Sequence, residues 1–361
     1  MAKKDKEETK KSSLEELRDS LSEKSKGVHI SILSQSDIAN INEWVLGPSY
    51  DLNRILSGSL FRGIPEKQFT VLVGPEASFK SSFMALMLAN AQKQGFTPLV
   101  IDTEGAWTKE FVTRWGIDPD NILYIYTPWI SEARVILGKI IDSGTEKLAI
   151  AVDSLGGFER FKVIDDAKKG EAKADQGSLQ KDLKVFLKMI VNVCKARKSI
   201  GFAGGHLYGN PSGYGAPEQM GGGKYLRLAG DIIISLKKFK LEDEDENVIG
   251  TQIKAVTLKN RWYPPFNEAT VDINYTSGIN PFAGMLDIAL KAGIFTQGGA
   301  WFTHVNTGEK IQGMEKVKVF MAENTHILQE IEEYIKNTGY STVNENVKQA
   351  EELLKGEGNE E

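Results

Sequence analysis

A short segment between two apolar stretches has the residue types of a phosphate-binding loop. It runs Gly74-Pro75-Glu76-Ala77-Ser78-Phe79-Lys80-Ser81. In a Walker A loop, backbone N–H groups at the start of a helix surround the phosphates of a nucleotide. A lysine reaches the β- and γ-phosphates, and a final hydroxyl binds Mg²⁺. The segment therefore predicts a nucleotide site in which Lys80 contacts phosphate and Ser81 binds the metal ion.

The loop departs from the Walker A pattern at one position. Phe79 stands where G-x-x-x-x-G-K-[ST] has its second glycine. Judged on these eight residues alone, the alternative is an ordinary connection between a strand and a helix that ends in Lys-Ser.

Carboxylates at the ends of two further apolar stretches support the nucleotide site. The run from Leu148 to Asp153 ends in an acid, which is the Walker B arrangement that places a carboxylate beside Mg²⁺. Asp102-Thr103-Glu104 ends another run. Because the carboxyl ends of parallel strands converge at one edge of a sheet, we expect Glu104 to orient or deprotonate the attacking water. Taken alone, an acid after a strand is more often a helix cap or a turn residue.

The elements that must position these residues alternate along the chain. Continuous runs rich in Val, Ile, Leu and Phe are typical of strands buried on both faces of a parallel sheet. Such runs lie at 69–74, 98–103, 122–126, 148–153 and 200–204. Helical patterns lie between them at 80–94, 108–115, 131–143 and 178–197. The alternation predicts an α/β fold with a mainly parallel central sheet.

Further elements are predicted after residue 230. Strand patterns at 231–240, 248–259 and 270–275 indicate antiparallel strands at the sheet edge, with the acidic run 242–246 at an exposed hairpin tip. A helix at 284–292, a hairpin at 301–313 and a helix at 325–337 indicate a small C-terminal α+β domain.

A short helix is predicted near the N-terminus. Ser13 and Glu16 form a capping box, and Leu14, Leu17 and Leu21 follow at helical spacing. Its narrow apolar stripe packs either on its own domain or on a neighbouring subunit. The predicted regions of the chain are a charged leader and oligomerisation segment at 1–47, a core at 48–280, a small domain at 281–340 and an acidic tail at 341–361.

Length, cysteine content and charge limit the class of protein. A chain of 361 residues buries roughly 75% of the surface that its unfolded form exposes, so its core needs no cross-links. With Cys194 as the single cysteine, neither a disulfide framework nor a Cys/His zinc cluster is expected. The charged N-terminal residues contain no apolar run typical of a signal peptide or membrane span, which favours a cytoplasmic protein. The net charge is −5, but residues 322–361 hold ten acids and three bases, so the body is mildly basic and the tail acidic.

Two long stretches interrupt the alternation of strands and helices. The first, 156–177, is rich in cations, and the second, 206–224, is rich in glycine and contains two tyrosines and a lysine. Backbone-pairing cations and stackable aromatic rings are the residue types of single-stranded DNA binding. The alternative is a pair of lids over a small substrate. The predicted DNA-binding residues are Arg160, Lys162, Lys168, Lys169, Tyr208, Tyr214 and Lys224.

Taken together and in this order, the motifs resemble the RecA-like strand-exchange recombinase family, in particular its phage UvsX-type branch. The resemblance extends from about Pro48 to Glu333. Phe79-Lys80-Ser81 and His206 resemble the UvsX branch, whereas the C-terminal 299–302 and 308–311 are more similar to bacterial RecA. Further matching segments are 50–56, 115–118, 152–154, 221–223, 259–261 and 265–266.

The resemblance implies a role for particular residues. Glu104 is the implied catalytic carboxylate, and His206 senses the γ-phosphate through a contact whose charge state depends on pH. Phe111 matches an aromatic that stacks on adenine, with core packing as the alternative. ATP and Mg are the implied cofactors, with Ser81 and Asp153 at the metal. The implied ATP-binding residues are Gly74, Pro75, Glu76, Ala77, Ser78, Phe79, Lys80, Ser81, Ser82, Phe111 and Asp153.

Two cations on one predicted strand have an implied role in a neighbouring subunit. Lys259 and Arg261 are two residues apart and point to one face. In the family such residues reach the γ-phosphate held by the adjacent protomer. The alternative is a pair of exposed strand cations.

The resemblance implies an ATP-dependent recombinase and DNA-dependent ATPase that forms a helical filament on single-stranded DNA and exchanges it into homologous duplex DNA. The implied partners are further copies of the chain, a single-strand-binding protein and a mediator or loader, with no membrane. The implied location is the bacterial cytoplasm, or the host cytoplasm for a phage-encoded protein. Two alternatives stay open: a RecA-fold ATPase with another task, such as a helicase or a kinase-like protein, and a DNA-binding filament scaffold whose ATPase has decayed.

Overall fold

A computed structural model of the chain describes residues 13–24, 28–162, 168, 176–209, 218–220, 223–243 and 246–340. The chain divides into two units, Met1–Asn42 and Glu43–Glu361. In the first unit, helix α1 (Ser13–Lys24) confirms the helix expected after the capping box, and the 3-10 helix η1 (Leu33–Gln35) follows it. The side chains of Leu14, Leu17 and Leu21 on α1 are exposed.

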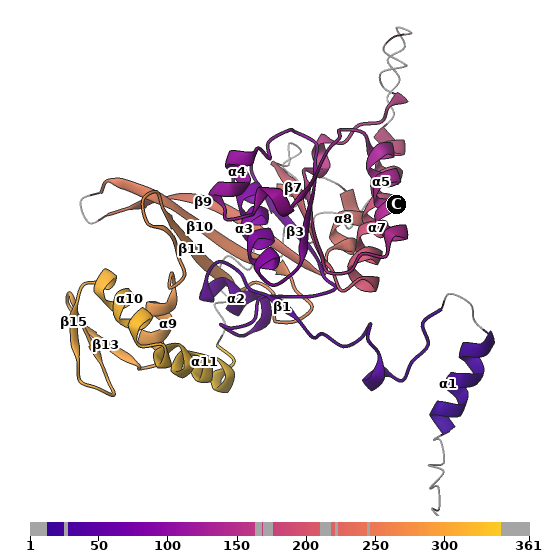
Figure 1. The fold of residues 1–361 in the computed structure, drawn as a ribbon. Helices are drawn as coiled ribbons and strands as arrows, with labels where there is room; N and C mark the ends of the chain where they lie inside the picture. The colour runs from indigo at the N-terminus through magenta and orange to yellow at the C-terminus, as the bar shows by residue number, and fades with distance from the viewer. Residues whose placement is uncertain are drawn as a thin grey trace, which may run out of the picture. The chain divides into compact units, whose positions relative to one another are not determined.

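A large sheet forms the centre of the second unit (Figure 1). Its described strands follow the order β12-β11-β10-β9-β3-β7-β6-β4-β5, and β8 pairs with β7 outside this path. Neighbours from β9 to β5 are parallel, and β10, β11 and β12 are added in antiparallel fashion. The bounds are β3 (Phe69–Gly74), β4 (Thr97–Asp102), β5 (Leu123–Tyr126), β6 (Leu148–Asp153), β7 (Ile200–Gly209), β8 (Glu218–Met220), β9 (Ile232–Glu242), β10 (Val248–Lys259), β11 (Glu268–Asn274) and β12 (Gly278–Asn280). The predicted α/β class with a mainly parallel sheet is confirmed.

Side chains of the parallel strands alternate between two apolar cores, one on each face of the sheet. In β3, Leu72 belongs to the core that contains Phe83 of α3 (Lys80–Lys93), whereas Val71 belongs to the core that contains Phe186 of α7 (Gln176–Ala196). Because helices cover both faces, β3, β4 and β6 are buried almost throughout, as their continuous hydrophobic runs predict. The same expectation is wrong for β5, which ends the sheet and exposes Leu123, Tyr124 and Tyr126.

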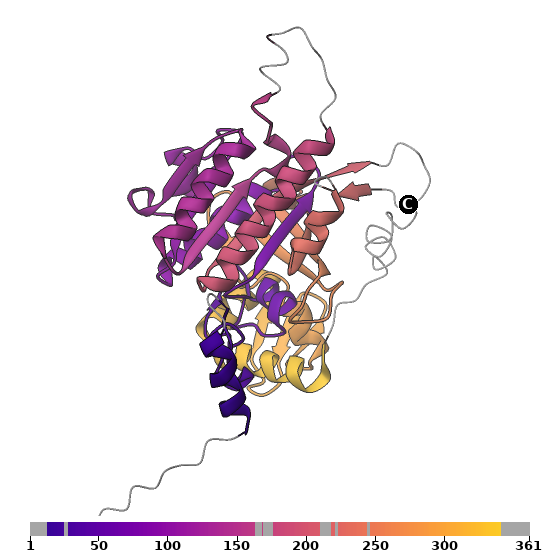
Figure 2. The same ribbon diagram turned by 90° about the vertical axis from the view of Figure 1, so that its right-hand side faces the viewer.

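The helices divide between the two faces of the sheet. Figure 1 shows α3 and α4 (Lys109–Arg114) on one side and α5 (Ile130–Ser143), α7 and α8 (Gly223–Ala229) on the other. Figure 2 views the second unit from the side of α5, α7 and α8, which lie across the strands. In the part of the chain that the structure describes, no helix is long and apolar enough to cross a membrane.

Helix α2 (Tyr50–Ser57) precedes the sheet and was not among the predicted elements. Ser49 caps it by accepting a hydrogen bond from the backbone N–H of Leu52, and Gly58 ends it with a φ of 77°. Arg54 is fully buried and pairs with Asp51 at 2.7 Å. Strand β1 (Trp44–Val45) precedes this helix in sequence and β2 (Ile64–Pro65) follows it, and the two strands form a separate two-stranded sheet.

Two expectations about strand pairing and loops are wrong in part. The strand expected at 231–240 is β9, which pairs parallel with β3, and only its other neighbour β10 is antiparallel. The stretch 206–224 is not a loop throughout: β7 continues to Gly209, β8 folds back on it, and α8 begins at Gly223. The glycines of this stretch hide its strand and helix propensity, because glycine is unfavourable in both.

The C-terminal part has an apolar core of its own. Its elements are α9 (Met285–Lys291), β13 (Phe295–Gly298), β14 (Trp301–His304), β15 (Lys310–Gln312), α10 (Met314–Glu323) and α11 (His326–Thr338). The predicted hairpin is a three-stranded sheet, β13-β14-β15, and helix α10 was not predicted. The carboxylate of Glu332 on α11 connects this part to the segment after α2. It accepts hydrogen bonds from the Ser59 hydroxyl and from the backbone N–H of Leu60, both at 2.7 Å.

Candidate nucleotide-binding site

The predicted phosphate-binding loop joins β3 to α3. β3 ends at Gly74 and α3 begins at Lys80, whose Nζ donates to the backbone oxygens of Gly74 (3.0 Å) and Pro75 (2.7 Å) and to Ser78 Oγ (3.2 Å). A side chain at Gly74 has no room, because its Cβ would lie 2.4 Å from Ser78 Oγ. The loop therefore folds closely around the lysine.

Lys80 lies near three carboxylates, but the hydrogen bonds that its ammonium group forms with described residues go to neutral oxygens. Burial lowers the pKa of Lys80, and the charges of Asp153, Glu104 and Glu76 raise it in part. Its hydrogen bonds go to carbonyl and hydroxyl oxygens. A phosphate oxygen carries negative charge, whereas these partners are neutral, so an anionic phosphate can replace them as the acceptor of the lysine ammonium.

Phe79 occupies the helix N-cap with a left-handed backbone, φ 78° and ψ 13°. This is the conformation that the missing glycine of the motif would supply. For a residue with a side chain it costs ~1–2 kcal/mol. The Phe79 ring packs edge to face on Trp115 with centroids 5.3 Å apart, a contact that offsets part of this cost. The loop thus keeps the backbone shape of a Walker A loop although its sequence departs from it.

Asp153 ends β6 beside the start of α3. It is 5% exposed and accepts hydrogen bonds from Trp107 Nε1 (2.8 Å) and from the Ser81 hydroxyl. Burial raises the pKa of Asp153, these hydrogen bonds lower it, and the charges of Glu104 and Asp102 raise it again. A buried carboxylate next to a hydroxyl gives the oxygen donors that Mg²⁺ prefers, so the residues present fit this ion.

Glu104 follows β4, which lies next to β6 in the sheet. Asp102 and Asp153 are direct register partners, so both strands end at the same level. The Glu104 side chain is exposed, and its Oε1 accepts a hydrogen bond from Ser154 Oγ at 2.8 Å. The structure therefore brings together Lys80, Asp153 and Glu104, which sequence reasoning assigned to one site.

Asp102 is a site residue that sequence reasoning missed. Its Oδ1 accepts from the backbone N–H groups of Glu104 and Gly105, both at 2.9 Å, and its Oδ2 from the N–H of Trp107 at 3.0 Å and the Tyr124 hydroxyl at 3.1 Å. Burial and the contact with Asp102 raise the pKa of Tyr124 to about 12. The carboxylate shapes the turn that carries Glu104. The sequence signal was an aspartate at a strand end followed by glycine, which is typical of an Asx turn.

His206 of β7 and Phe111 of α4 are two predicted site residues that follow the loop in sequence. In the register of β3 with β7, His206 is the direct partner of Gly74, so its backbone lies beside the start of the loop. Phe111 is half-buried on α4 and packs edge to face on Trp107 with centroids 5.3 Å apart. This packing agrees with the core alternative for Phe111, and its contact with adenine stays a prediction.

Lys259 and Arg261 lie far from the phosphate-binding loop of their own chain. Lys259 Nζ donates to the backbone oxygens of Arg227 (3.1 Å) and Gly230 (2.6 Å), and Arg261 pairs with Asp231 at 3.1 Å. The backbone N–H of Asp231 donates to the carbonyl of Phe69, which is the first residue of β3, whereas the loop begins at the last residue of this strand, Gly74. The five residue steps from Phe69 to Gly74 span about 17 Å.

The predicted DNA-binding residues are only partly described. Arg160 pairs with Asp182 of α7 at 3.1 Å, and Lys162 and Lys168 have exposed side chains. The backbone of Tyr208 belongs to β7 and that of Lys224 to α8. Lys169 and Tyr214 lie outside the described residues.

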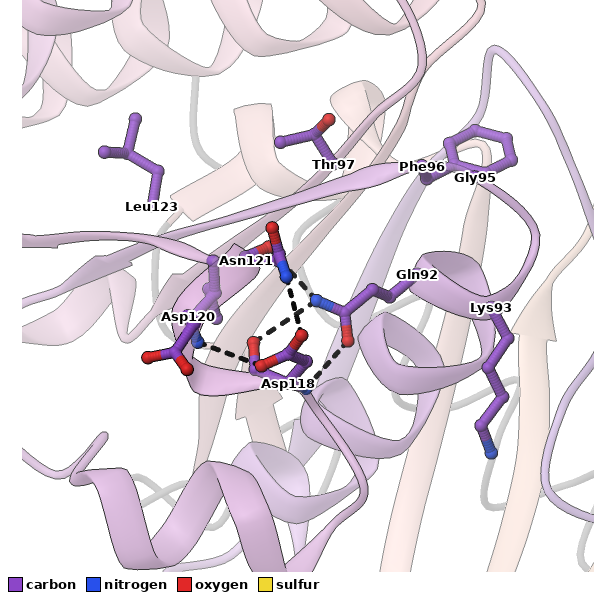
Figure 3. Close-up of a pocket in the computed structure, with 10 residues that line it drawn as sticks. Gln92, Lys93, Gly95, Phe96, Thr97, Asp118, Asp120, Asn121 and Leu123 are labelled. Carbon is purple, nitrogen blue, oxygen red and sulfur yellow. Dashed lines mark hydrogen bonds between the residues drawn. The ribbon is translucent and has the colours of Figure 1, made fainter.

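A cleft of about 590 Å³ lies away from this site (Figure 3). Its lining includes Thr97 and Leu123, the first residues of β4 and β5. The cleft therefore lies at the amino ends of the parallel strands, whereas the loop follows the carboxyl end of β3. On one side of the cleft, the side chain of Gln92 on α3 forms hydrogen bonds with the backbones of Asp118 and Asn121. Among the residues that the structure describes, its lining includes none of the predicted site residues.

A mainly parallel sheet with a Walker-type loop after β3 and acids after β4 and β6 defines an α/β protein of the P-loop class. Residues 19–280 match the RecA N-terminal domain and residues 283–339 match the RecA C-terminal domain. The chain belongs to the RecA family.

Individual relatives agree with this assignment. The chain is 28% identical over 321 residues to Protein RecA of Rickettsia bellii (strain RML369-C), covering 85% of this chain and 90% of that protein. It is 30% identical over 302 residues to Protein RecA of Wolinella succinogenes, covering 79% and 83%. The family is one of recombinases that are DNA-dependent ATPases, which assigns a recombinase function to this chain in general terms.

Proposed function

We propose that the chain is an ATP-dependent recombinase that forms a helical filament on single-stranded DNA and catalyses homologous pairing and strand exchange. The observation that carries the proposal is the convergence of Lys80, Asp153 and Glu104 at the carboxyl ends of three parallel strands. Such a convergence, in a member of the RecA family, supports ATP hydrolysis as the driving reaction.

Each residue of the site has a defined task in this proposal. Lys80 would release its carbonyl partners and donate to the β- and γ-phosphates. Ser81 and Asp153 would hold Mg²⁺, which neutralises phosphate charge when bound. Glu104 Oε1 is held by Ser154, so Oε2 is available to accept the proton of the attacking water. Asp102 acts as a positioning residue for the turn that carries Glu104.

Lys259 and Arg261 act on the ATP of a neighbouring protomer in this proposal. Their position at the sheet edge opposite the loop supports this, because neither side chain spans about 17 Å to its own loop. Hydrolysis then requires contact between subunits, and ATP at the interface stabilises the filament by mass action. The present partners of Lys259 are carbonyl oxygens, which phosphate oxygens of another subunit can replace.

A single strand supports communication between the nucleotide and DNA. β7 carries His206 beside Gly74 and continues to Gly209, where it pairs with β8. A shift of His206 upon contact with a γ-phosphate would therefore move the paired residues of β7 and β8, which lie within the second predicted DNA-binding stretch. Arg160, Lys162 and Lys168 belong to the first stretch, and binding of DNA by Arg160 would compete with its ion pair to Asp182.

The finer assignment is to a phage UvsX-type recombinase, supported by the Phe79-Lys80-Ser81 ending of the loop and by His206. A single-strand-binding protein, a mediator and a cytoplasmic location, bacterial or host, belong to the same proposal. A scaffold with a decayed ATPase is disfavoured by Phe79, because its backbone keeps the left-handed conformation that the loop needs. A helicase or kinase-like task stays the second alternative.

Phosphate release with and without single-stranded DNA, combined with electron microscopy, tests the proposal. We expect ATP-dependent helical filaments and DNA-stimulated hydrolysis. Filaments without hydrolysis would favour the decayed scaffold, and closed rings with hydrolysis would favour a helicase-like ATPase. Either result contradicts the proposed recombinase.

A further inference from the structure

The C-terminal domain holds three metal-ligand side chains away from the nucleotide-binding site. A ring nitrogen of His304, a ring nitrogen of His326 and a carboxylate oxygen of Glu330 all lie within 4.8 Å of one another. His304 ends β14, and the other two residues are four apart at the start of α11, so they share one helix face. The group joins the small sheet to this helix.

His304 is the buried member of the group. Its side chain is 0% exposed, its Nδ1 lies 2.9 Å from Thr307 Oγ1, and its buried Nε2 has no hydrogen-bond partner among the described residues. A buried nitrogen without a partner is unfavourable, because it has lost water without a replacement. If Nδ1–H donates to Thr307, the lone pair of Nε2 is left for a metal ion.

The surroundings hold these ligands in orientation. Phe295 and Phe320 pack against the His304 ring, with centroids 5.1 and 5.7 Å away. Asn306 Nδ2 donates to Glu330 Oε2 at 3.1 Å, which leaves Oε1 for another partner. Hydrogen bonds of this kind around histidine and carboxylate ligands are characteristic of built metal sites.

We propose that His304, His326 and Glu330 bind a divalent transition-metal ion, with Zn²⁺ as the best match. Two imidazoles and one carboxylate favour zinc over Mg²⁺ or Ca²⁺, which take mainly oxygen ligands. In a tetrahedral zinc site the ligand atoms lie roughly 3.4 Å apart, given zinc–ligand distances of about 2.1 Å. The exposed His326 side chain can supply this closer approach by rotation. The ion would cross-link β14 to α11 and stabilise the domain.

The sequence prediction that no Cys/His zinc cluster forms rested on the single cysteine. This group contains no cysteine, and its two histidines have no motif spacing, so only the packing of α11 on the small sheet brings them together.

Zinc binding to the full-length protein, prepared without a histidine tag and stripped with a chelator, tests the proposal by titration calorimetry. We expect one Zn²⁺ per chain, with affinity at least about tenfold lower in His326→Ala and in Glu330→Gln. His29→Ala removes a histidine outside the group and should bind Zn²⁺ like the wild type. Zinc should also raise the unfolding temperature of the wild type more than that of His326→Ala.

Substitution of the exposed His326, rather than the buried His304, keeps the test independent of folding. The visible spectrum of bound Co²⁺ gives a second readout, because tetrahedral coordination absorbs strongly and octahedral coordination weakly. Absence of saturable binding, equal affinity in the wild type and His326→Ala, or loss of binding in His29→Ala would each overturn the proposal.

Discussion

Replacing Phe79 by glycine and by alanine isolates the backbone conformation of the phosphate-binding loop. Both changes remove the ring that packs on Trp115, so the lost contact cancels when the two variants are compared. At φ 78°, alanine costs ~1–2 kcal/mol and glycine costs essentially nothing. The greater freedom of glycine in the unfolded chain offsets about 0.4–1 kcal/mol of this advantage. Phe79→Gly should therefore be more stable than Phe79→Ala by about 1 kcal/mol.

Guanidinium unfolding followed by circular dichroism measures this difference, and the unfolding temperatures should differ by only about 1–1.5 °C because the chain is long. The matched control is Val135 of α5, which is 59% exposed on a regular helix. There Val135→Ala should be more stable than Val135→Gly by ~1 kcal/mol, which is the opposite order. If Phe79→Ala equals or exceeds Phe79→Gly in stability, the left-handed conformation at the helix start is refuted.

Three further predictions concern the site and the tail. Mixing Glu104→Gln protein with a Lys259→Ala, Arg261→Ala protein should restore some DNA-stimulated hydrolysis, because mixed filaments contain intact composite sites; no recovery at any ratio, with mixed filaments confirmed, argues against action between subunits. The raised pKa of Asp153 means that this carboxylate takes up its proton at a higher pH than an ordinary aspartate and then loses Mg²⁺. Calorimetry should thus show Mg²⁺-dependent ATP binding that weakens as pH falls, a dependence absent in Asp153→Asn. Ending the chain after Lys355 removes three acids and should tighten duplex DNA binding modestly at low salt, whereas superimposable salt titrations by anisotropy would exclude competition by the tail.

The catalytic strands were predictable because a buried parallel strand leaves a local mark in the sequence. Residues such as Val71 and Val152 are apolar because helices cover both faces of the sheet, and an acid or glycine marks where each run ends. Strand and loop positions therefore follow from short windows of sequence. The positions of Lys80, Glu104 and Asp153 at one edge follow from parallel topology alone.

Features that depend on distant segments were not predictable. For Asp102 only the turn is local, because the Tyr124 hydroxyl that completes its contacts comes from β5. The continuation of β7 to Gly209 depends on pairing with β8, and its glycines suppress the local strand signal. The distance of Lys259 from the loop depends on its contact with Gly230, which precedes β9 at the level of the first residue of β3, and no window of sequence contains this contact.

The most direct measurement of the central claim is DNA strand exchange. A labelled single strand bound by the protein is mixed with a homologous or an unrelated duplex, and transfer of the strand is followed by fluorescence. The wild type should exchange strands only with ATP and only with the homologous duplex, and Lys80→Ala should be inactive while its circular dichroism spectrum shows a folded protein. DNA-stimulated ATP hydrolysis without any exchange would contradict the claim and assign this RecA-family protein another task.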